Sequence, residues 1–303
     1  MVLISVQLMG GLGNQLFQIF ATLAHAMHYG KRFVFENLQE LGNGPPIKRP
    51  TYWDTVFKGL KPYLVTPGRV VHNVPVWFEP HPYYAPLPEL PTDTALWGYY
   101  QSERYFVSER EKIYALLHIP EQIQQVRDSI FADVTKGVTG PIIAVHFRTG
   151  TYEMPPYMPQ MPMEYYEKGI NMITSVTPAT SVTAIPPSSP ITILCFGEPR
   201  DAALVDTKVE WLRAKFKAYT VIKCPDCIPD WQQLYMIACC DHAVIGNSTF
   251  SWWGAYLMAT ATPKDDKHHQ VMHPPPDKWL RPGDPCTSLV RTLFPDNWTR
   301  VCF

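Results

Sequence analysis

Short apolar stretches alternate with amphipathic ones from the beginning of the chain. Residues 2–9 are mostly apolar, and residues 15–29 then repeat Leu, Phe and Ala at the spacing of one helix face. Residues 31–36, KRFVFE, have the composition of a second strand. This order predicts a strand, a loop, a helix and a strand, which is how a doubly wound α/β unit begins.

The same alternation returns in the second half of the chain. Strands are predicted at 141–150 (where the strand runs into a polar loop), 191–197, 219–224 and 242–247. Helices are predicted at 109–117, 121–132, 163–173, 202–216, 230–240 and from 248 onward. Residues 174–190 are low in complexity and predict an exposed loop, whereas 41–96 show no clear pattern. Because 303 residues are many for one domain, we predict an α/β protein with domains at 1–135 and 136–303.

Composition and charge narrow the classes of partner. The 26 basic and 27 acidic residues leave a net charge of −1, so no basic surface for nucleic acid is expected. No apolar run reaches the ~18 residues of a membrane span, and the apolar start lacks the features of a secretion signal. The seven cysteines are an odd number, which favours free thiols in a reducing compartment. We therefore expect a cytoplasmic protein without a membrane segment.

The first candidate site is the glycine-rich stretch between the first strand and the first helix. Gly11 and Gly13 would let a ligand approach the backbone, and the helix N-terminus would favour an anion. Together with Glu36 at the end of the next strand, this spacing is partly that of a dinucleotide-binding loop. However, Leu16 stands where the third glycine of that pattern belongs. A tight turn in which Asn14 and Gln15 cap a helix explains the stretch equally well.

The second candidate is HFRTGTY, residues 146–152, where a strand delivers His146 and Arg148 to its carboxyl end. Open α/β sheets bind ligands at that edge. Alternate residues share a face of a strand, so His146 and Arg148 can point the same way. A guanidinium grips a phosphate with two parallel hydrogen bonds. The alternatives are an interdomain ion pair for Arg148 and an ordinary core histidine for His146.

The third candidate is VIGNSTFSWWGAYL, residues 244–257, where a strand ends and a helix begins. Ser248 and Thr249 would open that helix, so their hydroxyls and the first free amides can face a phosphate. Phe250 and the two tryptophans after it would pack behind this turn. The alternative is an N-cap followed by an aromatic core face.

With these stretches in place, the chain resembles glycosyltransferase family 11, the α-1,2-fucosyltransferase type. The resemblance is carried in order by GGLGNQLFQ, GYYQSERYF, MPMEYYEKGI and GNSTFSWWGAYL, from residue 10 to about residue 257. VMHPPPDKW at 271–279 resembles the family's next segment more loosely. The first and fourth matches are the longest and most specific.

The resemblance implies two Rossmann-like domains in a GT-B-like architecture. It also implies an inverting enzyme that uses GDP-fucose, a galactose-containing acceptor and neither a metal nor another cofactor. The C-terminal domain would hold the donor, with Arg148, Asn247, Ser248, Thr249, Phe250 and Ser251. The N-terminal domain would face the acceptor with Gly11, Gly13, Asn14 and Gln15. Catalysis would fall to Arg148, with His146 or Glu198 accepting the acceptor's proton.

Two departures from the family pattern affect these expectations. The family's His-x-Arg-Arg-x-Asp motif keeps its first arginine as Arg148, but Thr149 and Thr151 replace the second arginine and the acid. The family's Phe-Ser-Asp-Asp is Phe-Gly-Glu-Pro here, so Glu198 stands in for one acid only. A non-catalytic or redirected relative that binds a nucleotide sugar or a glycan therefore stays open. A nicotinamide-dependent oxidoreductase, based on the glycine spacing and Glu36, is the third alternative.

Overall fold

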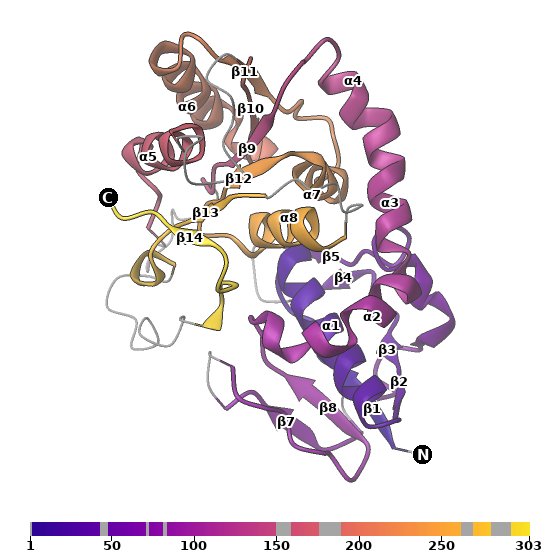
Figure 1. Cartoon of the computed structure of the whole chain (residues 1–303). Coiled ribbons are helices and arrows are strands. Elements are labelled where there is room, and N and C mark those ends of the chain that lie inside the picture. The colour runs from indigo at the N-terminus through magenta and orange to yellow at the C-terminus, as the bar shows by residue number, and fades with distance from the viewer. Residues whose placement is uncertain are drawn as a thin grey trace. The chain divides into compact units, whose positions relative to one another are not determined.

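A computed structural model describes most of the chain and divides it into two compact units (Figure 1). The described residues are 2–42, 48–70, 73–80, 84–149, 159–175, 189–261, 269–279 and 292–303. The first unit is Met1–Pro120 with Leu289–Pro295, and the second is Glu121–Ser288 with Asp296–Phe303. The division thus falls at 120/121, where the sequence placed it at 135/136.

The first unit is built on a parallel sheet of four strands in the order β2-β1-β8-β7. These strands are β1 (Leu3–Val6), β2 (Arg32–Phe33), β7 (Val76–Phe78) and β8 (Thr94–Trp97). Helix α1 (Leu12–His28) follows β1 and buries most of its surface, including Leu16, Phe17 and Phe20. It begins three residues earlier than predicted, because Gly13 and Asn14 already lie in its first turn.

The predicted strand at 31–36 is wrong as a single element. The chain forms β2 and then β3 (Phe35–Glu36), which pairs with β6 (Leu64–Val65) in a separate parallel sheet. The composition of this segment does not distinguish one strand from two, because Phe33, Val34 and Phe35 form an unbroken apolar run across the point where β2 ends and β3 begins. The remaining elements of this unit are β4 (Glu40–Leu41), β5 (Arg49–Pro50), η1 (Lys58–Tyr63), η2 (Glu103–Tyr105), η3 (Val107–Glu109) and α2 (Arg110–Leu117).

The second unit is built on a parallel sheet of six strands in the order β11-β10-β9-β12-β13-β14. Their bounds are β9 (Ile142–His146), β10 (Thr192–Phe196), β11 (Thr220–Lys223), β12 (His242–Val244), β13 (Val271–His273) and β14 (Thr299–Arg300). Every residue of β9 and β10 is buried, as expected of parallel strands covered on both faces. The strand order reverses direction at β9, so β9 and β12 flank the topological switch point of a Rossmann-type sheet.

Helices cover both faces of this sheet (Figure 1). Their bounds are α5 (Met163–Thr174), α6 (Ala202–Lys215), α7 (Asp230–Cys239) and α8 (Thr249–Thr260), with short turns η5 (Pro199–Asp201) and η6 (Pro276–Lys278). Side chains of α5 and α6 pack with Val145 and Phe147 on one face. On the other face, α8 places Phe250 against the ring of His146.

A helical segment at the start of the second unit explains where the two units divide. It consists of α3 (Ile119–Val126), the π-helical turn η4 (Arg127–Phe131) and α4 (Ala132–Val134). The thiol of Cys239 on α7 donates to the carbonyl of Ile123 at 3.8 Å, so the segment packs against the second unit's own helices. The sequence predicted this helix, but its periodicity did not indicate which domain it covers.

The fold confirms the predicted class, an α/β protein with two Rossmann-like units. None of the described helices has the length and hydropathy to cross a membrane. The cysteines within the described ranges are all free thiols, including Cys224 and Cys227, which are spaced as Cys-x-x-Cys. Most of the predicted loop at 174–190 lies outside the described residues.

Candidate functional site

The carboxyl ends of β9 and β12 meet at the switch point of the second unit. Gly246 makes this possible: a Cβ there would lie 3.0 Å from the carbonyl oxygen of His146 and 3.3 Å from the Cβ of Arg148. The two stretches that the sequence singled out in this half, HFR and GNST, are therefore neighbours. The sequence indicates both stretches, but it does not indicate Gly246 as the reason they can approach each other.

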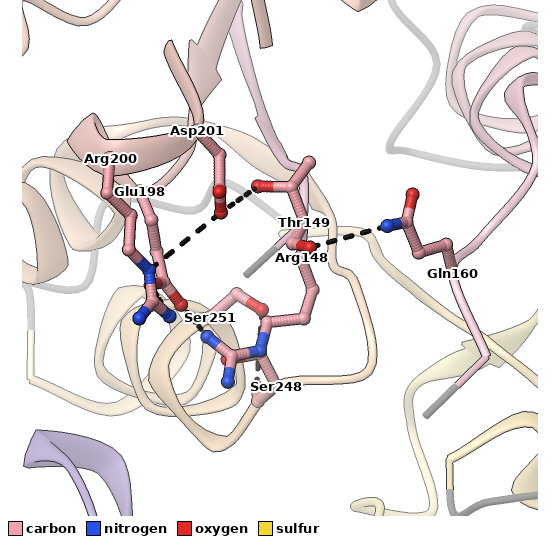
Figure 2. Close-up of polar contacts among 8 residues, drawn as sticks. All are labelled: Arg148, Thr149, Gln160, Glu198, Arg200, Asp201, Ser248 and Ser251. Carbon is pink, nitrogen blue, oxygen red and sulfur yellow. Dashed lines mark hydrogen bonds and ion pairs between the residues drawn. The ribbon is translucent and has the colours of Figure 1, made fainter. Parts of the chain in front are cut away.

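Arg148 lies two residues beyond β9 and forms an ion pair with Glu198, which follows β10 (Figure 2). Glu198 also pairs with Arg200 of η5, so one carboxylate lies between two guanidinium groups. The three side chains are only partly covered, with exposed fractions of 22% for Arg148, 23% for Glu198 and 37% for Arg200. Arg148 and Glu198 are site residues predicted from the sequence, whereas Arg200 is not.

Thr149 occupies the position after Arg148 and is buried. Its hydroxyl lies 3.0 Å from a carboxylate oxygen of Asp201, to which it donates, and its carbonyl accepts from the side chain of Gln160 at 3.3 Å (Figure 2). Asp201 also lies 4.0 Å from the Nε of Arg200. These contacts join the loop after β9 to the one after β10. Thr151, the other altered position of the motif, lies outside the described residues.

His146 ends β9 with its ring buried against Phe250, the ring centroids being 5.4 Å apart. Burial, reinforced by the positive charge of Arg148, lowers the pKa of His146 to about 3. The imidazole is therefore neutral near pH 7. Its Nδ1 is buried and has no hydrogen-bond partner within the described parts of the chain, while the backbone carbonyl of His146 accepts from the hydroxyl of Tyr166 at 3.2 Å.

Asn247 follows β12 and uses its side-chain amide to hold two other segments. Its Nδ2 donates to the carbonyl of Pro159 at 2.7 Å and to that of Lys278 at 3.3 Å. Its Oδ1 is buried and has no hydrogen-bond partner among the described residues. Asn247 thus positions the loops beside the switch point.

Helix α8 begins directly at the switch point. Ser248 is its N-cap, with a backbone in the extended region and no side-chain capping bond among the described residues. Trp252 and Trp253 behind it are buried, as the alternative of an N-cap followed by an aromatic core face also predicts. Thr249 and Phe250 of the first turn are half-buried, whereas Ser251 is buried and its hydroxyl donates to the carbonyl of Ser248 at 3.2 Å. The first backbone amides of a helix have no partner within it. This turn can therefore offer N–H groups to an anion.

In the first unit, the glycine-rich turn lies at the switch point between β1 and β8. Gly10 has a φ of +78°, and a Cβ there would lie 2.4 Å from Nδ2 of Asn14, so glycine is required. Gly11 is the N-cap of α1 and Gly13 lies in its first turn. The side chain of Gln15 donates to the carbonyls of Gly10 at 3.1 Å and Pro50 at 2.8 Å. Gln15 therefore holds the turn, and no described residue hydrogen-bonds to its buried Oε1.

Asn14 connects this turn with the loop after β8. Its Oδ1 accepts from the side-chain amide of Gln101 at 3.1 Å. One residue earlier, Tyr100 has a φ of +51°, which is strained for an aromatic residue. Glu79 holds this strained turn by accepting from the backbone amides of Tyr99 at 2.8 Å and Tyr100 at 3.1 Å. The sequence identified the region only through its family resemblance, and Gln101 and Glu79 were missed.

Two other predictions concern metals and dinucleotides. Within the described parts of the chain, no three His, Cys, Asp or Glu side chains gather as a metal site would require. Glu36, on which the nicotinamide alternative depended, is buried and accepts from the backbone amide of Val70 at 3.1 Å. Its carboxylate therefore has a structural partner within its own unit.

Comparison with known proteins bears on the second unit most directly. The sequence profile of Glycosyl transferase family 11 matches residues 204–264, which run from α6 through α8 and contain the switch-point loop after β12. The Escherichia coli protein O-antigen biosynthesis glycosyltransferase WbnK is 26% identical over 172 residues, covering 54% of this chain and 50% of its own length. These matches support the interpretation of the chain as a member of glycosyltransferase family 11. The chain spans about half the length of this curated relative.

Solved structures of two fucosyltransferases are also similar to this chain. NodZ alpha-1,6-fucosyltransferase co-crystallized with GDP is 15% identical, with a TM-score of 0.44 over 84% of this chain and 92% of that one. Another similar solved structure is that of fucosyltransferase NodZ from Bradyrhizobium. POFUT1 in complex with GDP-fucose is 12% identical, with a TM-score of 0.46 over 89% of this chain and 97% of that one.

Proposed function

We propose that the chain is an inverting, metal-independent glycosyltransferase of GT-B-like architecture. It would transfer L-fucose from GDP-fucose to the 2-hydroxyl of a galactoside. The observation that carries this proposal is the place of Arg148, at the switch point beside the N-terminus of α8 in the unit that matches family 11. Ligands of doubly wound sheets bind outside the carboxyl ends of the strands at such a point.

The donor diphosphate would lie between Arg148 and the first turn of α8. A guanidinium can hold two phosphate oxygens at once, and the free amides of the helix N-terminus favour an anion. Ser248, Thr249, Phe250 and Ser251 would surround it, with Asn247 positioning the neighbouring loops. As the fucose–phosphate bond breaks, negative charge grows on GDP, and these fixed positive groups stabilise it.

The acceptor hydroxyl must lose a proton, and two described residues could take it. His146 is neutral at physiological pH and its Nδ1 has no partner among the residues that the structure describes, but its ring is buried. Glu198 is a carboxylate on the more accessible side of the site, but it lies between two arginines. A carboxylate paired in this way becomes an effective base only when another anion takes over its partners. Glu198 therefore fits the role only after the donor has bound.

The first unit would bind the acceptor through the turn after β1. The amides of Asn14 and Gln101 hydrogen-bond each other at the switch point of that sheet, and amide groups suit sugar hydroxyls. Gly11 and Gly13, which have no side chains, would leave room for the sugar beside the turn. Gln15 would hold the turn in place through its hydrogen bond to Pro50. Accordingly, Asn14→Ala is expected to raise the KM for acceptor and leave the Kd for GDP-fucose unchanged.

Calorimetric titration with GDP-fucose in EDTA tests the proposal, with NAD and UDP-galactose as controls. Binding of GDP-fucose alone, followed by fucose transfer to a galactoside or slow hydrolysis without acceptor, is the expected result. Binding without any turnover would instead indicate a non-catalytic relative. Binding of NAD alone, or of no nucleotide, would contradict a GDP-sugar transferase.

A further inference from the structure

We infer that Arg200 is a second diphosphate-binding residue, and that Glu198 occupies the anion position between Arg148 and Arg200 until a diphosphate replaces it. This inference rests on the proposed function and names two residues of its donor site. Here the two-arginine site means Arg148 and Arg200 on either side of Glu198.

The two arginines come from different strands and converge on one point. Arg148 follows β9, whereas Arg200 lies in η5 after β10, and these strands are adjacent in the sheet. Figure 2 shows both guanidinium groups reaching the same carboxylate. Both loops lie at the carboxyl edge of the sheet, where its ligands bind. The convergence is thus at the proposed donor site.

The loop that carries Arg200 is held in place by its neighbours. Pro199 begins η5, and the backbone amide of Asp201 bonds to the carbonyl of Glu198 at 2.9 Å. Asp201 also accepts from the buried Thr149 at 3.0 Å. Because Thr149 directly follows Arg148, this bond fixes the spacing between the two arginine-bearing loops. The guanidinium groups are therefore positioned before any ligand arrives, which lowers the entropy cost of binding.

The chemistry of the pair favours a diphosphate over a carboxylate. A carboxylate between two guanidinium groups has two oxygens and one negative charge, whereas a diphosphate offers more oxygens and more charge to the same donors. Arg200 is 37% exposed on its side chain and Glu198 is 23% exposed, so a ligand from solvent can reach them. A diphosphate would displace Glu198 and leave its carboxylate free beside the reacting sugar.

Binding of inorganic pyrophosphate, GDP and guanosine to Arg200→Gln tests the inference. We expect the variant to bind pyrophosphate and GDP about 10- to 100-fold more weakly, the size of a lost charge-assisted hydrogen bond, with guanosine unaffected. Arg200→Lys keeps the positive charge but cannot form the two parallel hydrogen bonds of a guanidinium. Its affinity for pyrophosphate and GDP should therefore lie between those of the wild type and Arg200→Gln. Arg300→Gln is the matched control, since Arg300 is exposed at the far edge of the same sheet, roughly 19 Å from β10 by strand spacing.

Glu198→Gln gives an independent measurement of the same idea. A neutral amide competes less for the arginines, so pyrophosphate binding should tighten by up to about fivefold.

If wild-type protein binds GDP and pyrophosphate, but Arg200→Gln changes neither affinity by more than about twofold, the inference is overturned while the proposed function stands. If pyrophosphate binding depends on Arg200 but GDP binds no better than pyrophosphate, the two-arginine site is supported and the guanine-nucleotide donor fails. Thermal melting without ligand shows whether each variant is folded.

Discussion

At the scale of single residues, Arg148 carries the strongest functional prediction. Arg148→Ala should lower kcat for transfer by on the order of 10²–10³, because a fixed positive group at the leaving diphosphate is removed. Arg148→Lys should recover only part of this, since an ammonium cannot form the two parallel bonds of a guanidinium. Initial rates at saturating donor and acceptor measure the effect. Retention of more than a tenth of wild-type transfer by the alanine variant would exclude this role.

Gly246 has a less obvious effect on the same site. In Gly246→Ala the new Cβ would press on the carbonyl of His146 at 3.0 Å and on Arg148 at 3.3 Å. We expect a loss of about 1–3 kcal/mol in the free energy of unfolding, together with weaker GDP binding because Arg148 is displaced. Urea denaturation and calorimetry measure the two effects.

A matched control for Gly246 is Gly42→Ala, because none of the described residues lies within 4 Å of a Cβ at Gly42. The control should change neither the free energy of unfolding nor the affinity for GDP. Equal behaviour of the two variants would mean that the ends of β9 and β12 can separate without consequence.

Single residues also show how far the sequence predicted the site. Arg148, Glu198 and the residues 247–251 lie just beyond strand ends, where the sequence placed them, because their motifs fix the distance from a strand end. Arg200 was not named, since its importance comes from Glu198 and Arg148, the latter 52 residues away along the chain by the numbering. Gly10 was passed over in favour of Gly11, because a positive φ leaves no mark on the sequence that separates adjacent glycines.

At the scale of elements, α8 is held from behind by α7. Gly254 lies at the contact: a Cβ there would be 2.7 Å from Cβ of Ile237 and 3.1 Å from the carbonyl of Leu234. An alanine within a helix usually stabilises it relative to glycine. Here Gly254→Ala should instead destabilise the protein by about 1–3 kcal/mol, because it forces the two helices apart.

A double-mutant cycle with Ile237→Ala separates this packing effect from helix propensity. This substitution removes the Cγ2 atom that the new Cβ would meet at 2.7 Å, so it should make the cost of Gly254→Ala smaller, as measured by urea denaturation. Strict additivity of the two substitutions would contradict a clash between α7 and α8. Because α8 begins at the switch point, a shift of this helix should also weaken GDP binding.

At the scale of the whole molecule, three buried histidines make stability depend on pH. Burial lowers the pKa of His146 to about 3 and those of His25 and His273 to about 4. In the unfolded chain their pKa returns to about 6.5, so below that pH the unfolded state binds more protons than the folded state. The free energy of unfolding should therefore fall as pH is lowered from about 6.5 to about 4, by up to about 1.4 kcal/mol per pH unit for each histidine.

Urea denaturation at several pH values measures this slope. His146→Gln should flatten it by up to about 1.4 kcal/mol per pH unit, whatever the variant's stability at neutral pH. His28→Gln is the matched control, because the side chain of His28 is 59% exposed. An unchanged slope in His146→Gln would show that this histidine does not titrate between the two states in that range.

The sequence by itself determined that the chain forms two α/β units, and which segments end at the edges where ligands bind. Local periodicity suffices for this, because the burial of one face fixes whether a segment is a helix or a strand. Only the tertiary structure decided that β9 lies between β10 and β12, that residues 31–36 divide between two sheets, and that Arg148 and Arg200 share Glu198. Strand order and contacts between distant residues come from how whole elements pack, and the hydrophobic pattern within any one element does not encode them.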